Sequence, residues 1–155
     1  MNNHLLIGAA TCVALLLPVV LIILRGRQIR KKKQTLLTNL MDQIANREKL
    51  FITERQLWRN RVMGMDRINK MLVLIWIHDS KVEEYLIALD EINYCSVFQQ
   101  TSGKSHIRAI LLELTFRSKQ RSPLQIPFYE EIQDGIFEMK RLAERAEYWK
   151  KALSN

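Results

Sequence analysis

The feature that most constrains this chain is an apolar run near its start. Leu5 to Leu24 is 20 residues long and contains no charged side chain. A helix of that length rises about 30 Å, which is the thickness of the hydrocarbon core of a bilayer. Because every backbone amide must be paired inside lipid, a helix is the form expected for such a span. The run therefore predicts a transmembrane helix over residues 5–24, preceded by a short extracytoplasmic tail, residues 1–4.

A cleaved signal peptide is the main alternative for this run. Signal peptides carry basic residues before the apolar stretch and a small-x-small site after it. Here Met-Asn-Asn-His precedes the run, and it ends in Leu24-Arg25-Gly26-Arg27. Cys12 follows Ala-Ala-Thr, which does not fit a lipoprotein signal. The pattern favours a retained span.

Cations on one side of the run predict its orientation. No charged residue precedes the run, and the six that follow within nine residues are Arg25, Arg27, Arg30, Lys31, Lys32 and Lys33. The positive-inside rule then places the C-terminal side in the cytoplasm. We expect a single-pass protein of the inner (cytoplasmic) membrane, N-out and C-in, with most of the chain cytoplasmic.

The net charge of +8 is confined to one segment. Residues 25–65 hold 11 Lys or Arg and three Asp or Glu, whereas residues 66–155 hold 13 of each. A neutral C-terminal part argues against nucleic-acid binding. The basic cluster of Arg25 to Lys33 is expected to attract the bilayer's anionic headgroups non-specifically, without recognition of one acidic lipid.

Residues 25–65 are predicted to form a basic amphipathic juxtamembrane helix. Leu37, Ile44, Phe51 and Trp58 recur every seven residues. That spacing is typical of an apolar helix stripe. A coiled coil would need a second apolar position in each heptad, and this position is only partly apolar. Three arrangements stay open: packing on the following domain, pairing between protomers, or lying on the bilayer.

Residues 66–155 are predicted to form a small soluble domain rich in antiparallel strands. The expected strands, about five, are Met71–Ile77 and Val82–Leu89 as a hairpin, then Tyr94–Gln100, Ile107–Arg117 and Leu124–Tyr129. Apolar and polar residues alternate most clearly over Ile107–Arg117. Pro127 makes the last strand an edge of the sheet, because proline lacks the N–H that a central strand needs.

The chain is expected to end in a helix from about Asp134 to Leu153 that covers the sheet. Its apolar residues are spaced by three and four: Ile132, Ile136, Met139, Ala143, Ala146, Trp149 and Leu153. Acidic residues near the start and lysines near the end suit the helix dipole. The fold class is therefore α+β: a transmembrane helix, an amphipathic helix, and a small antiparallel sheet or partial barrel capped by a C-terminal helix.

The stretch from about Leu86 to Leu153 resembles a group of small, uncharacterised bacterial membrane-anchored proteins. The residues that carry the resemblance are Leu89, Ile92, Cys95, Ile107, Leu112, Phe128, Tyr129, Glu130, Asp134, Ala146, Glu147 and Trp149. A curved antiparallel sheet capped by one C-terminal helix is also similar to pleckstrin-homology-like domains of the PH/GRAM type. Such folds serve lipid, peptide and structural roles, so the resemblance implies a fold and no single function.

The sequence offers no catalytic or metal-binding pattern. Gly103-Lys104-Ser105 lacks the earlier glycine of a phosphate-binding loop and is better explained as a turn. The histidines His4, His78 and His106 have no spacing that suits a zinc site. We expect no enzyme activity, no metal and no cofactor.

The two cysteines are expected to play no part in a disulfide. Cys12 lies in the predicted span and Cys95 in the predicted soluble domain, so they cannot meet. Cys95 is expected to be a small buried apolar residue and not a reactive thiol.

The arrangement as a whole predicts a membrane-tethered, non-enzymatic interaction or scaffold protein. Its cytoplasmic domain would hold an unknown protein partner, or further copies of the chain, near the membrane. The alternative is an anionic-lipid-sensing module of the same architecture. Basic residues in turns and loops would then contact headgroups: Lys81, Lys104, Lys119 and Arg121.

Overall fold

The protein has an α+β fold. The computed structural model describes the backbone of residues 3–78, 81–103 and 106–154, with the side chains of these residues apart from 3–19 and 23. The helices are α1 (Asn3–Arg47) and α2 (Met139–Leu153), with short 3-10 helices at η1 (Leu89–Glu91) and η2 (Ile136–Glu138).

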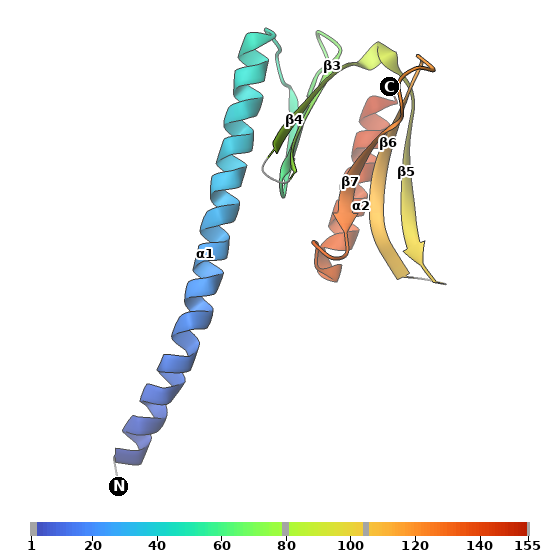
Figure 1. The fold of residues 1–155 in the computed structure, drawn as a ribbon. Coiled ribbons are helices and arrows are strands. Elements are labelled where there is room, and N and C mark those ends of the chain that lie inside the picture. Colours follow the sequence, from blue (N-terminus) through green and yellow to red (C-terminus); the bar gives the residue numbers. More distant parts are fainter. Residues whose placement is uncertain (1–2, 79–80, 104–105, 155) are drawn as a thin grey trace.

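Two antiparallel sheets make up the body of the molecule. The first has four strands in chain order: β1 (Glu54–Trp58), β2 (Arg61–Asp66), β3 (Met71–His78) and β4 (Lys81–Ala88). The second has three: β5 (Ile92–Ser102), β6 (His106–Phe116) and β7 (Leu124–Glu130). In Figure 1, α1 runs along one side of the four-stranded sheet and extends beyond it, while α2 lies beside the three-stranded sheet.

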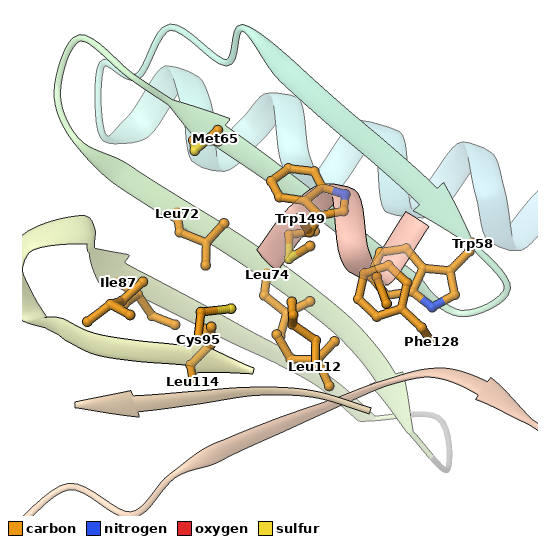
Figure 2. Close-up of a cluster of buried hydrophobic side chains, with 14 of the residues drawn as sticks. Trp58, Met65, Leu72, Leu74, Ile87, Cys95, Leu112, Leu114, Phe128 and Trp149 are labelled. Carbon is orange, nitrogen blue, oxygen red and sulfur yellow. The ribbon is translucent and has the colours of Figure 1, made fainter. Parts of the chain in front are cut away.

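The main core lies between the two sheets and α2. Alternate residues of the strands point inward, and Figure 2 shows Leu72 and Leu74 of β3 in the same buried cluster as Leu112 of β6 and Trp149 of α2. The ring of Trp58 stacks on that of Phe128, with centroids 4.6 Å apart, and its indole N–H donates to the Pro127 carbonyl at 3.2 Å. These contacts join β1 to β7 and so join one sheet to the other.

A second apolar cluster joins α1 to the opposite face of the four-stranded sheet. Leu37, Met41 and Ile44, which share one side of the helix, are buried against side chains of β2 and β3: Val62, Val73, Ile75 and Ile77. Of the three arrangements that the sequence left open for this helix, the structure has the first, packing on the domain.

The prediction of a membrane-spanning helix is corrected by the structure. No helix in the part of the chain that the structure describes has an apolar stretch long enough to cross a bilayer. The described side chains of α1 begin at Val20. The side chains of residues 5–19 and 23 lie outside the described set, as do residues 1–2. The predicted single-pass, N-out and C-in placement in the inner membrane is corrected with it.

The prediction of helix through residue 65 is also wrong. α1 ends at Arg47, Lys49 takes a left-handed conformation with φ 54°, and β1 and β2 follow. All six residues of β2 are buried, because α1 covers one face of the sheet and the main core covers the other. A strand covered on both faces shows no alternation of apolar and polar residues, so its sequence carries no period of two.

The later strands match their predictions closely. Predicted strands 71–77 and 82–89 form the β3–β4 hairpin, whose turn residues Asp79 and Ser80 lie outside the described residues. The predicted strands 94–100, 107–117 and 124–129 correspond to β5, β6 and β7, and β7 is an edge, as Pro127 indicated.

The C-terminal helix begins later than predicted, at Met139. Ala146, Trp149 and their neighbour Leu142 are buried, whereas Ile132 and Ile136 precede the helix and are exposed. The Asp134 carboxylate accepts a hydrogen bond from the Glu130 backbone N–H at 2.8 Å, and residues 130–134 form a tight turn. That turn delays the start of the helix.

Candidate binding cleft beside the β1–β2 turn

A polar cleft lies where three segments of the chain converge. α1 contributes Arg30, Lys33 and Gln34, and the β1–β2 turn contributes Arg59 and Asn60. The segment that joins β7 to α2, with the first turn of α2, contributes Gln133, Asp134, Gly135, Glu138 and Arg141. Its volume of about 480 Å³ falls within the range of small-ligand pockets.

The cleft carries more cations than carboxylates. Arg59 pairs with Asp134, and Arg141 pairs with Glu138. Arg30 and Lys33 stand three residues apart and therefore on one side of α1. Among the described residues neither of them has an ion-pair partner, so positive charge is left in excess at the α1 side of the cleft.

An ion pair between a buried arginine and a partly exposed glutamate lies next to the cleft. Arg61 is only 2% exposed, and its guanidinium donates to Glu130 Oε2 at 3.1 Å and lies 4.2 Å from the centre of the Trp76 ring. Burial lowers the pKa of Arg61, while Glu130 and Asp134 oppose that shift. Arginine stays protonated in spite of this shift. Its buried charge is compensated by the Glu130 carboxylate, and loss of that partner would be strongly destabilising.

The β1–β2 turn holds two unusual residues. Arg59 has φ 48°, a conformation that glycine adopts more easily than arginine. Asn60 donates from Nδ2 to the Ile77 carbonyl at 2.5 Å, while its buried Oδ1 has no hydrogen-bond partner among the described residues. An unpaired buried acceptor costs about 1–3 kcal/mol. Both residues line the cleft, so strain and an unsatisfied polar atom gather at this place.

Large apolar side chains are exposed beside the cleft. Ile132 is 100% exposed, Phe137 is 95% exposed and Ile136 is 65% exposed. All three belong to the segment between β7 and α2, which also supplies Asp134 and Gly135 to the cleft. We call the three residues the apolar tip. Exposed apolar side chains gathered in one short segment are typical of an interaction surface.

The structure divides the basic cluster that the sequence singled out. All six residues, Arg25, Arg27, Arg30, Lys31, Lys32 and Lys33, are exposed on α1. Only Arg30 and Lys33 line the cleft. The cations of the cluster therefore lie on more than one side of α1, because consecutive residues of a helix point in different directions.

The three loop cations that the structure describes do not come together in one site. Lys81 begins β4, whereas Lys119 and Arg121 lie in the β6–β7 loop, beside η1 at the far end of β4. Arg121 pairs with Glu91 at 2.5 Å and lies over the Phe116 ring. Lys104 lies outside the described residues.

The residues of the cleft outside α1 were missed by the sequence analysis. Arg59 and Asn60 fell inside a predicted helix, and Asp134 was placed at the start of another. Asn60, a residue that turns favour, lies in the short polar stretch Arg59-Asn60-Arg61 between Trp58 and Val62, and this was the signal that could have placed a turn here.

The side chains of two of the three histidines are described. Of these, His106 contacts Glu131 at 2.5 Å and His78 meets the Trp76 ring edge-on. No group of three or more His, Cys, Asp or Glu residues suited to a metal ion was found among the residues whose placement is described.

Comparisons with known proteins supply no family for this chain. No family model matches it, and neither a curated protein nor a solved structure does.

Proposed function

We propose that this protein is a non-enzymatic interaction module whose apolar tip docks on a partner protein. The observation that carries the proposal is the near-complete exposure of Ile132 and Phe137. Burying such side chains in a partner contributes about 1.5–3 kcal/mol each. A single short segment that offers three of them can supply the apolar centre of a small interface.

The charge around the tip indicates the kind of partner. In Figure 1 the β7–α2 segment lies at the end of the sheets beyond which α1 continues. That part of α1 carries the six cations from Arg25 to Lys33 and no acidic residue. A partner with an apolar pocket bordered by acidic residues would complement this end of the molecule, and its charge would also speed association.

The pleckstrin-homology-like resemblance forms part of the proposal. Seven antiparallel strands in two facing sheets, followed by a C-terminal helix, are the elements of such a domain. Those folds often act by binding and not by catalysis, which agrees with an interaction role. An experimental structure in which the two sheets do not share a core would contradict this part.

The second candidate is an anionic-lipid-sensing module. The same three apolar side chains and the same cations would suit the surface of an anionic bilayer, since apolar insertion and electrostatic attraction add together there. The lead proposal and this candidate make different predictions for one pair of variants.

The test compares the two ends of the molecule. Ile132→Ser with Phe137→Ser changes the two most exposed residues of the apolar tip. The control, Phe51→Ser with Ile68→Ser, changes two apolar residues that are 66% and 74% exposed and whose backbone N–H groups both donate to Asp66. The full chain and both variants are used to capture proteins, and each captured protein is purified and titrated back. The chain is also sedimented with phosphatidylglycerol and with phosphatidylcholine vesicles.

The lead proposal expects a purified partner that binds the wild type and the control variant and loses affinity for the tip variant. Loss of about 3 kcal/mol or more corresponds to over a hundredfold. If no protein partner binds, and the chain binds phosphatidylglycerol vesicles but the tip variant does not, the lipid candidate replaces the lead proposal. Equal behaviour of the two variants in both assays would overturn both.

A further inference from the structure

We propose that the cleft beside the β1–β2 turn is a site for a small ligand that carries a phosphate or carboxylate group, held by Arg30, Lys33 and Arg59. This inference goes beyond the docking of a partner and does not depend on the apolar tip. It concerns a small anionic molecule and not a macromolecular surface.

The first support is the shape of the site. Residues far apart in the sequence, at positions 30–34, 59–60 and 133–141, converge on one hollow of about 480 Å³. A pocket of this size, with charged groups converging from several elements, is the usual setting for a small ligand. Because α1 is held on the sheet by Leu37, Met41 and Ile44, the cations on the preceding turns are held over the β1–β2 turn.

The second support is the uncompensated charge. Arg59 and Arg141 already have carboxylate partners in Asp134 and Glu138. Arg30 and Lys33 have none among the described residues, although carboxylates lie in the same cleft. An anion would place its oxygens among these cations, and charge-assisted hydrogen bonds of that kind are about twice as strong as neutral ones.

The third support is the state of the β1–β2 turn. Arg59 keeps a left-handed backbone where glycine or asparagine would be less strained. Its side chain reaches Asp134, which is 5% exposed and also caps the Glu130 N–H. This carboxylate fixes one edge of the Arg59 guanidinium, and the planar group has further N–H donors for a ligand.

The experiment titrates the full chain with inorganic phosphate and, separately, with acetate, at constant ionic strength set with chloride. Binding is followed by calorimetry. The test variant is Arg30→Gln with Lys33→Gln. The matched control is Lys31→Gln with Lys32→Gln, which removes the same charge from neighbouring exposed positions that do not line the cleft.

The proposal expects saturable binding of one of the two anions to the wild-type chain. The dissociation constant of that anion should rise about tenfold or more in the test variant and change by no more than about twofold in the control. The anion that binds tells phosphate from carboxylate. An equal loss in both variants would reduce the effect to general charge and overturn the proposal. So would the absence of saturable binding of either anion to the wild-type chain.

Discussion

At the scale of single residues, Asp66 shows how one carboxylate can organise a turn. It is buried at the end of β2 and accepts hydrogen bonds from the backbone N–H groups of Phe51, Ile68 and Asn69 at 2.6, 2.8 and 2.9 Å. Burial by itself would raise the pKa of Asp66, but these hydrogen bonds outweigh it and hold the pKa below its ordinary value. The carboxylate thus ties the segment after α1 to the β2–β3 turn.

Asp66→Asn is expected to lower the free energy of unfolding by about 1–3 kcal/mol at pH 7. Since the pKa of Asp66 is lower in the folded than in the unfolded state, its stabilisation is complete above the unfolded value near 3.9 and is lost as pH falls through the folded value. Urea titrations at neutral and at acid pH measure the difference.

The control for that experiment is Asp42→Asn, which breaks an exposed ion pair with Arg55. Such a surface pair contributes less than about 1 kcal/mol. The role given to Asp66 would be wrong if Asp66→Asn lowered the free energy of unfolding by as little as Asp42→Asn does. It would also be wrong if the effect of Asp66→Asn were equally large at neutral and at acid pH.

Cys95 behaves at this scale as the sequence indicated, as a buried apolar residue. It is 3% exposed, and burial raises the pKa of its thiol to about 12. In a Cys12→Ser background, a disulfide reagent at pH 8 is therefore expected to modify the native protein far more slowly than the urea-unfolded protein, because the thiolate is the reactive form. Equal rates in the two states would contradict the structure.

At the scale of elements, the contact between α1 and β2 depends on a glycine. A Cβ on Gly64 would come within 2.9 Å of Ile52 Cγ2 and 3.1 Å of Met41 Cε. Gly64 therefore lets the helix approach the sheet closely enough for Leu37 and Ile44 to be buried. Because β2 is covered on both faces, the strand has no other place to move.

Gly64→Ala is expected to lower the free energy of unfolding by about 1–3 kcal/mol, as overpacking does, and to reduce hydrogen-exchange protection of α1 around Met41. Gly26→Ala is the matched control, since a Cβ there meets nothing within 4 Å. In a helix this change is expected to be neutral or stabilising by up to about 1 kcal/mol. A Gly64 variant as stable as the Gly26 variant would show that the close approach is unnecessary.

At the scale of the whole molecule, the two sheets and α2 share one core and should unfold together. Trp58 and Phe128 link the sheets, and the Trp149 indole N–H links α2 to β1 by donating to Gln56 Oε1 at 2.6 Å. No described strand pairs one sheet with the other, so side chains carry the connection.

Phe128→Leu is expected to lower the free energy of unfolding, with about 0.5–1.5 kcal/mol of the loss due to the ring pair itself. Tryptophan fluorescence and far-ultraviolet circular dichroism should still report one coincident transition in urea. Separate transitions in the wild-type protein would mean that the sheets are independent units.

Much of the second half of the fold could be predicted from the sequence. β6 has a buried face and a more polar face, and its alternation was visible. Pro127 marked the edge strand because it cannot donate a hydrogen bond, and Trp149 lay on the buried stripe of α2. Each of these signals is local, since it depends on neighbours within a few residues along the chain.

The rest was decided only by tertiary structure. The β1–β2 hairpin was hidden because α1 and the core together bury both faces of β2. The cleft depends on Arg59 meeting Asp134, 75 residues later, and on α1 lying beside the β1–β2 turn. The turn at residues 130–134 precedes the helix, which begins only at Met139, and Ile132 in that turn is exposed. The spacing of apolar residues along an element indicates whether one of its faces is buried. Contacts between segments far apart in the sequence produce no such spacing, so they could not be predicted from it.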